Sequence, residues 1–389
     1  MNARVEADSL RLGSGHVHQH AGDVFTCDRR QDFVPHVIRT HRGGRWRRVD
    51  RNKNAGEWAK FVHRSEMLVF DVDDGGEGGP GLVTGVIPSK EDVAARLAAL
   101  APVPGTAVAE IGTDCGWTAA LLDHRLQGGQ VVTVADTERL AEIARQRLHP
   151  YPRVRVVSGP DAGILGPAGA FHGLLSHRAV RRVPWEWVTR VRPSGRLCLP
   201  VRTALGGSST RLVLTVARDG ASASGRFHAG PAPQTVWLRG HRPGEGTAVE
   251  SQGSPRSSEA LDARGAHVRP AARLFAGLLR PDLRMQVVRG VAQLEGDVAD
   301  RLRIHDHQSS RAVVFLHSPR IYEWGPRDLG SDLFDALGQW HAAGEPEVEQ
   351  LGVTITETEH TLWLGAPDGP SWRLPELHTI TGEVERHAT

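Results

Sequence analysis

The sequence contains little cysteine and no long apolar run. Its three cysteines, Cys27, Cys115 and Cys198, lie far apart in 389 residues and form no Cys-x-x-Cys pair, so neither a disulfide framework nor a zinc site is indicated. The 20 histidines show no His-x-x-x-His spacing on a convincing helix, and no metal site is predicted. No stretch reaches the apolar length of a membrane helix, and the first twenty residues lack the basic-then-apolar order of a secretory signal. We therefore expect a cytoplasmic protein that does not cross a membrane.

The composition provides enough apolar material for a folded core. The hydrophobic fraction is 39% and the mean hydropathy is −0.33, and the length suits a main domain with one or two smaller units. The formal net charge of +2 gives no indication of a nucleic-acid partner, and none is expected. A basic segment at 39–48 and an acidic one at 71–77 have two interpretations. They form a solvated surface loop, or the basic segment forms a rim that holds an acidic peptide.

Short apolar runs alternate with helical patterns in the first two thirds of the chain. Runs at 107–111, 131–134, 154–157, 171–175 and 197–201 are predicted as strands, with helices starting near Ser89, through 119–122 and at 138–148. This alternation predicts an α/β fold, a Rossmann-like, doubly wound and mostly parallel sheet. Residues 211–216 and 234–238 are expected to close the sheet as an antiparallel pair.

Changes in composition divide the chain into four segments. Residues 1–85 form an N-terminal segment with substrate-side loops, and residues 86–240 form the α/β domain. Residues 241–269 are rich in Gly, Ser, Pro and Arg and are expected to form a linker or long loop. Residues 270–389 are expected to form a smaller, mixed α+β C-terminal extension.

A glycine-bearing turn, Glu110-Ile-Gly-Thr-Asp-Cys-Gly116, follows the first predicted strand of the α/β domain. At the carboxyl edge of an open α/β sheet, such a turn lets a ligand approach the backbone. Asp136 follows the second strand, where a carboxylate can accept hydrogen bonds from ribose hydroxyls, and Gly159 follows the third. The predicted nucleoside-cofactor site comprises Glu110, Gly112, Thr113, Asp114, Cys115, Gly116, Trp117, Asp136, Gly159, Pro160 and Asp161. The alternatives are that the turn is an ordinary connection between a strand and a helix, and that Asp136 is a helix N-cap.

The segment from about Asp32 to Gly240 resembles the protein-L-isoaspartate O-methyltransferases. The resemblance is carried by Asp32-Phe-Val-Pro35, by residues 109–117 and by Pro193-Ser-Gly-Arg-Leu-Cys-Leu-Pro-Val201. It implies a class I methyltransferase fold, S-adenosylmethionine as cofactor and a peptide carboxylate as acceptor. The C-terminal part more loosely resembles actinobacterial homologues from biosynthetic clusters for graspetides, lanthipeptides or lasso peptides. Those enzymes esterify an aspartate of a ribosomally made, cyclised precursor peptide, and the ester closes to an aspartimide.

Several positions depart from the family pattern. Asp114 stands where the family has a glycine, and the acid expected at the end of the second strand aligns with Ala135. His172 replaces an aspartate, Ser89 is displaced by one position from the family's active-site serine, and the small residues after the fourth strand are replaced by Ser176-His177-Arg178-Ala179. These departures indicate a changed acceptor pocket beside a cofactor site that is mostly kept.

Methyl transfer to a carboxylate that is already ionised at neutral pH requires positioning and no general base. Ser89, Ser176, His177 and Arg178 are therefore the candidate catalytic residues, as donors that orient the acceptor carboxylate. Ser89 has the alternative role of a helix cap, and His177 and Arg178 that of exposed loop residues. The leading hypothesis is a methyltransferase that modifies a precursor peptide. The alternatives are an isoaspartyl repair enzyme and a catalytically silent methyltransferase fold that serves as a binding partner.

Overall fold

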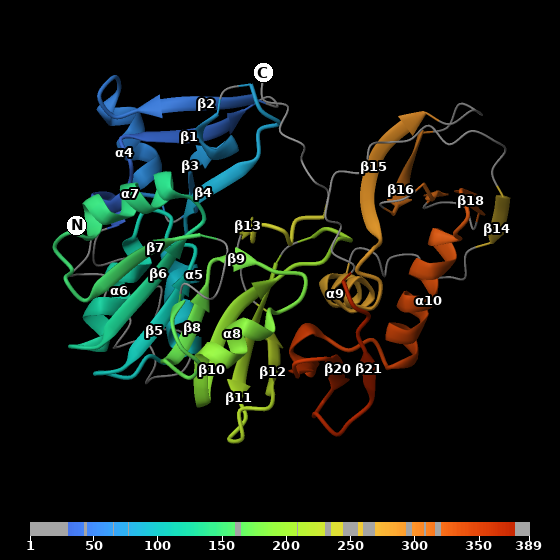
Figure 1. Cartoon of the computed structure of the whole chain (residues 1–389). Coiled ribbons are helices and arrows are strands. Elements are labelled where there is room, and N and C mark those ends of the chain that lie inside the picture. The colour runs from blue at the N-terminus through green and yellow to red at the C-terminus, as the bar shows by residue number, and fades with distance from the viewer. Residues whose placement is uncertain are drawn as a thin grey trace, which may run out of the picture. The chain divides into compact units, whose positions relative to one another are not determined.

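The computed structural model describes most of the chain after residue 29. The described residues are 30–42, 45–64, 66–76, 78–159, 165–207, 209–229, 235–243, 256–259, 269–292, 298–306, 309–315 and 320–377. They form two compact units (Figure 1). The first unit consists of Met1–Val201, Ser208–Trp237 and Gly352–Thr358, and the second of Arg202–Gly207, Leu238–Leu351 and Glu359–Thr389.

The first unit begins with a small antiparallel sheet and two helices. The helices are α3 (Arg30–Phe33) and α4 (Ala55–Val62), and α4 begins where the Asn54 side chain accepts a hydrogen bond from the backbone of Glu57 at 2.9 Å. The sheet has the order β2 (Arg45–Asp50), β1 (Val37–Arg42), β3 (Leu68–Val72), β4 (Val83–Ile87).

The centre of the first unit is the predicted doubly wound sheet, which is confirmed. Five parallel strands lie in the order β7 (Val154–Ser158), β6 (Gln130–Ala135), β5 (Ala107–Ile111), β8 (Phe171–Ser176), β10 (Val191–Val201). The antiparallel strands β11 (Thr210–Val216), β12 (Ala223–His228) and β19 (Leu351–Ile355) continue it. The strand order reverses between β5 and β8, which is where open α/β sheets bind ligands.

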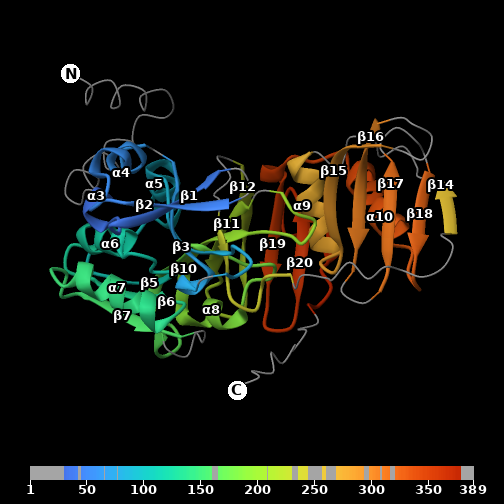
Figure 2. The same cartoon turned by 90° about the horizontal axis from the view of Figure 1, so that it is seen from above.

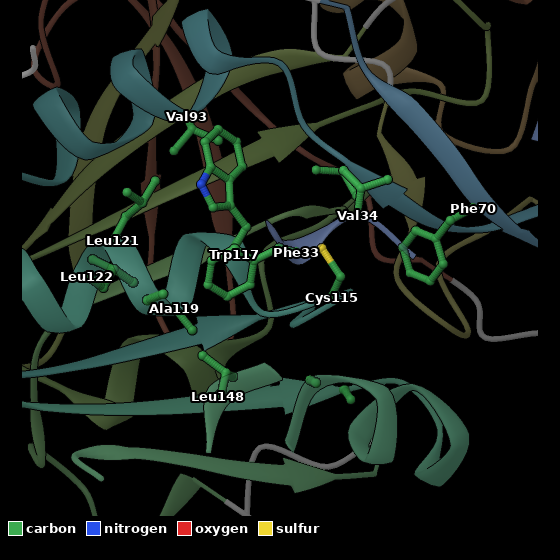
Figure 3. Close-up of a cluster of buried hydrophobic side chains, with 14 of the residues drawn as sticks. Phe33, Val34, Phe70, Val93, Cys115, Trp117, Ala119, Leu121, Leu122 and Leu148 are labelled. Carbon is green, nitrogen blue, oxygen red and sulfur yellow. The ribbon is translucent and has the colours of Figure 1, made fainter. Parts of the chain in front are cut away.

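Helices α6 (Trp117–Leu126), α7 (Glu138–Leu148) and α8 (Trp185–Arg190) lie between these strands along the chain, and α5 (Lys90–Leu100) leads from β4 into β5. The apolar faces of α5, α6 and α7, with residues of β5, β6 and the small sheet, form one large cluster of buried side chains. Figure 3 shows part of this cluster, in which Trp117, Leu121 and Leu122 of α6 lie beside Val93 of α5. Burial of this apolar surface fixes the helices and so positions the loops at the carboxyl ends of the strands.

The second unit is built on an antiparallel sheet and two helices (Figure 2). The sheet has the order β14 (Arg256–Glu259), β18 (Arg320–Trp324), β17 (Arg311–Phe315), β16 (Val298–His305), β15 (Arg284–Ala292). The helices are α9 (Pro270–Leu279) and α10 (Leu329–Ala342), and the short strands β20 (His360–Leu364) and β21 (Ser371–Arg373) form a hairpin. Among the described residues, no helix is both long enough and apolar enough to cross a membrane.

Three sequence predictions differ from this architecture. The antiparallel partner of β11 is β12, not residues 234–238, because the turn at Asp219-Gly220 lets the chain fold back at once. Within 234–238, β13 (Val236–Trp237) pairs in parallel with β9 (Arg178–Ala179). The predicted linker at 241–269 contains strand β14.

The compact units also divide the chain differently from the predicted segments. The predicted boundary at 240 lies close to the change of unit after Trp237, whereas residues 1–85 share a unit with the α/β domain. The segment Gly352–Thr358 returns to the first unit because β19 pairs with β12.

Candidate functional site

The candidate site lies where the carboxyl ends of β5, β6 and β8 meet. Gly112 follows β5, Asp136 follows β6, and Ser176, His177 and Arg178 lie at the end of β8 and just beyond it. The structure thus brings the predicted residues of three strand ends together. Gly159 directly follows β7 with φ +141°, and Pro160 and Asp161 lie outside the described residues.

Arg178 is the centre of this arrangement. Its side chain has 0% exposure, and its guanidinium donates to both carboxylate oxygens of Asp114, at 3.1 and 2.8 Å. The same guanidinium donates to Asp136 through Nε at 2.6 Å and contacts it through Nη2 at 2.5 Å. Burial by itself lowers the pKa of Arg178, but the two carboxylates raise it above its ordinary value. Arg178 is therefore a permanently charged group held between two acids.

The guanidinium also fills the space beside Gly112. A Cβ built on Gly112 would lie 2.8 Å from Nη1 of Arg178 and 3.0 Å from its Cζ, and Gly112 has φ +91°. Glycine is required here both by the backbone conformation and by the close approach of Arg178.

Asp114 supports this contact from a left-handed backbone conformation. Its φ is +49°, and one carboxylate oxygen also accepts the backbone N–H of Val86 in β4 at 3.3 Å. Burial raises the pKa of Asp114 above its ordinary value, and Arg178 opposes this shift. Asp114 is thus an anchor for Arg178.

A second buried network runs under the turn. Thr133 of β6 donates to Glu110 Oε2 at 2.5 Å, Thr113 and Thr133 share a hydrogen bond at 2.6 Å, and Glu110 Oε1 lies 3.1 Å from Nε2 of His177. Burial raises the pKa of Glu110 to about 8 and holds that of His177 well below its ordinary value. Both groups are therefore neutral near pH 7, and Nδ1 of His177 has no hydrogen-bond partner among the described residues.

Ser176 and Ser89 are engaged by the backbone. The fully buried Ser176 hydroxyl donates to the carbonyl of Arg178 at 2.9 Å and accepts its N–H at 3.0 Å, which shapes the turn that carries Arg178. Ser89 caps α5 by accepting the N–H of Asp92 at 3.1 Å, the alternative considered for it. The cap of α7 is Thr137 and not Asp136.

The remaining residues of the turn pack into the core. Cys115 and Trp117 belong to the buried cluster drawn in Figure 3, and burial raises the pKa of the Cys115 thiol to about 12. Gly116 has φ +90°, and a Cβ there would meet Leu148 of α7 at 2.8 Å. The two glycines of the turn therefore have different roles. Gly112 faces the candidate site, whereas Gly116 packs against the core.

Two buried polar residues of this region were not predicted. Thr133 lies inside an otherwise apolar strand, and Arg96 of α5 donates to the Ser176 carbonyl at 2.5 Å and to Asp92 at 2.8 Å. A polar residue within an apolar strand was the available signal for Thr133. Arg96 gives none, because its helix position does not reveal that it reaches the end of β8.

Comparison with known proteins gives a consistent set of relatives. Residues 83–224 match the family model described as protein-L-isoaspartate(D-aspartate) O-methyltransferase. A protein-L-isoaspartate O-methyltransferase of Leptothrix cholodnii is 33% identical over 139 residues, which is 34% of this chain and 48% of that protein. The one of Methylorubrum populi is 31% identical over 149 residues, 38% of this chain and 68% of that protein. The chain spans about half the length of the first of these relatives.

A solved structure titled protein-L-isoaspartate O-methyltransferase shares the fold over most of the chain. Its TM-score is 0.51 at 16% identity, and the match covers 91% of this chain and 96% of the other.

Proposed function

The chain belongs to the protein-L-isoaspartate O-methyltransferase family, and from this premise we propose that it is a carboxyl O-methyltransferase. Its methyl donor would be S-adenosylmethionine and its acceptor a side-chain carboxylate of a polypeptide. The observation that carries the proposal is the glycine turn after β5, which lies beside Asp136 at the point where the strand order reverses.

The residues at this edge do not fit the cofactor in the conformation described. A ligand that approaches the backbone of Gly112 meets the Arg178 guanidinium. This guanidinium is so close that a Cβ atom on Gly112 would clash with it. Asp136, the candidate ribose acceptor, already accepts two contacts from the same guanidinium. Cofactor binding therefore requires Arg178 to leave this position.

The proposed acceptor is a carboxylate that already carries its negative charge, so methyl transfer to it needs no general base. An aspartate side chain has an ordinary pKa near 3.9 and is ionised at neutral pH, so the chain has only to orient it. Once displaced, Arg178 is the one candidate with a charged donor suited to a carboxylate. His177 offers only its buried Nδ1 edge, and the Ser176 hydroxyl is held by the backbone. This assigns the acceptor-binding role to Arg178 before the other three candidates.

Two acceptors follow from this role. The names of the relatives support an isoaspartyl residue as the first candidate acceptor. The second is an aspartate of a ribosomally made, cyclised precursor peptide. The backbone nitrogen that follows it would attack the ester carbonyl of the methylated side chain, expel methanol and close the ring to an aspartimide. The replaced segment Ser176-His177-Arg178 favours the second candidate, because the acceptor side is where the chain departs most from the family pattern.

A third function, a catalytically silent fold that binds a partner, is favoured by one observation. Arg178 occupies the cofactor position, and its charge is paired with the carboxylates of Asp114 and Asp136. Such a site is stable without any ligand.

Mass spectrometry after incubation with S-adenosylmethionine tests these functions. An isoaspartyl peptide and a cyclised aspartate-containing precursor are offered separately. Methyl gain on the isoaspartyl peptide supports repair, and methyl gain followed by a net loss of one water on the precursor supports maturation. No change on either peptide, with no binding of S-adenosylhomocysteine, refutes methyl transfer and leaves the silent fold.

A further inference from the structure

One face of the sheet of the second unit is covered by a helix, and the described side chains on its other face are partly or fully exposed. Helix α10 packs on β16, β17 and β18 (Figure 2). A Cβ on Gly330 of α10 would meet the side chains of Ile321 and Glu323 at 2.6 and 3.1 Å, so these residues of β18 face the helix. Because side chains alternate along a strand, Tyr322 and Trp324 lie on the opposite face.

The same alternation holds across the sheet. The buried members on the helix side are Met285, Leu302, Ile304, Ala312, Val314 and Ile321. The positions between them are partly or fully exposed, and they are Arg284, Gln286, Val288, Arg301, Arg303, His305, Arg311, Val313, Phe315, Tyr322 and Trp324. We call this set the open face.

The strand register places basic and aromatic side chains in different halves of the open face. One row across the strands pairs Arg284 with His305, His305 with Arg311, and Arg311 with Trp324. In the next row, Arg303 pairs with Gln286 and Val313, and Val313 pairs with Tyr322. Residues paired in this way have Cβ atoms about 5 Å apart. The guanidiniums therefore lie on β15 to β17, and the aromatic rings lie on β17 and β18.

The arginines of β16 and β17 on the open face, Arg301, Arg303 and Arg311, have no carboxylate beside them among the described side chains of the face. The Nε groups of Arg301 and Arg311 have no hydrogen-bond partner among the described residues. Burial and the neighbouring Arg303 lower the pKa of Arg301, and burial and Arg284 lower that of His305. An anion bound here would relieve this repulsion.

The aromatic half is ordered by its own contacts. The Arg311 guanidinium lies 4.5 Å from the centroid of the Trp324 ring, and the Phe315 and Tyr322 rings meet edge to face at 5.9 Å. These contacts hold the rings in place next to the arginines. A ligand of this surface therefore needs acidic groups and apolar or aromatic groups close together.

We propose that the open face docks an acidic segment of a polypeptide, with its carboxylates on Arg301, Arg303 and Arg311 and its apolar side chains on the rings of β17 and β18. Guanidinium forks match carboxylates geometrically, and the sheet supplies only a few of them. Nucleic-acid surfaces need a wide basic footprint, whereas this chain carries 45 acidic against 47 basic residues. The choice of a polypeptide rests on the proposed function, and the docking itself does not require methyl transfer.

Fluorescence anisotropy on the full chain tests the proposal. The probe is a short fluorescein-labelled peptide rich in glutamate with two tryptophans, compared with the same peptide carrying lysine for glutamate and with an oligothymidylate of equal charge. The glutamate peptide should bind, the lysine peptide should not, and binding should weaken as salt rises. The double variant Arg301→Ser, Arg303→Ser should weaken binding about tenfold, because each exposed charge pair contributes up to about fivefold to the affinity.

The matched control removes two exposed arginines elsewhere, Arg226→Ser with Arg373→Ser, and should change the affinity less than twofold. Thermal denaturation of both variants checks that they fold. Absence of binding by the glutamate peptide, or an equal loss in the control, overturns the proposal. Tighter binding of the oligothymidylate than of the glutamate peptide also overturns it, in favour of a nucleic-acid surface. Because no methyl donor is present, a failure here is distinct from a failure of the proposed methyl transfer.

Discussion

Removing the charge pair over Gly112 should open the cofactor position. The double variant Arg178→Ala, Asp114→Gly deletes the guanidinium together with one of its carboxylates and frees Asp136, whose side chain is 12% exposed and can be hydrated. It also gives position 114 a glycine, which the φ of +49° favours. We expect this variant to bind S-adenosylhomocysteine far more tightly than the wild type does.

The size of the effect follows from the cost of moving Arg178. Breaking a buried ion pair costs about 3–5 kcal/mol. If the wild type has to meet this cost before the ligand enters, the binding-competent fraction is about 10⁻² to 10⁻⁴, and the apparent affinity falls by the same factor. Isothermal titration calorimetry should therefore show at least about a hundredfold gain for the double variant.

The control removes a more exposed pair with the same two-bond geometry away from the site, Arg153→Ala with Asp123→Ala, whose guanidinium and carboxylate meet at 3.1 and 3.2 Å. It should leave ligand affinity unchanged. Equal affinities of the wild type and the double variant would refute the reasoning, because Arg178 would then not stand in the way. Absence of binding by both proteins would contradict the proposed cofactor as well.

Three further predictions test the supporting residues. Glu110→Gln should flatten the pH dependence of stability. In the folded wild type the buried acid keeps its proton up to about pH 8, whereas in the unfolded chain it loses the proton near pH 4.5. The wild-type free energy of unfolding, measured by urea titration, should therefore fall from pH 6.5 to 8 by up to about 1 kcal/mol per pH unit. A wild-type curve that rises over this interval would contradict the assignment. Ser89→Ala should cost about 1 kcal/mol of stability, and so should Thr137→Ala, which removes the other helix cap. Added to the double variant Arg178→Ala, Asp114→Gly, neither change should alter the affinity for S-adenosylhomocysteine. A loss of affinity with Ser89→Ala alone would indicate that Ser89 contacts the ligand. Gly116→Ala should destabilise by about 1–3 kcal/mol more than Gly105→Ala, since both have positive φ but only the first meets a side chain; equal losses in thermal unfolding would show that the core yields without cost.

The α/β architecture could be predicted because each strand is a separate apolar run between helical patterns. Strands 107–111, 131–134, 154–157 and 171–175 coincide with β5 to β8 to within one residue or so at each end. Closure of the sheet could not be predicted in the same way. The pairing of β12 with β19 joins segments more than 100 residues apart, and nothing local in either segment indicates its partner.

The candidate site was predictable by position and not by contact. The sequence indicates that Gly112, Asp136 and Arg178 follow neighbouring strands, and their meeting at one edge follows from parallel topology. The sequence does not indicate which way a long side chain turns. Arg178 lies 64 residues from Asp114 and 42 from Asp136, and its burial over Gly112 depends on the space left by the surrounding backbone.

The residues at positions 114 and 178 are best understood as one mutually dependent pair. An aspartate in the left-handed region costs about 1 kcal/mol, and its buried charge would cost several more without a partner. A buried guanidinium would be equally unfavourable without its acids. Together these groups satisfy each other, with Asp136 as the second acid. Because the guanidinium and both carboxylates are paired, any ligand of this site has to compete with Arg178 for Asp136 and for the space beside Gly112.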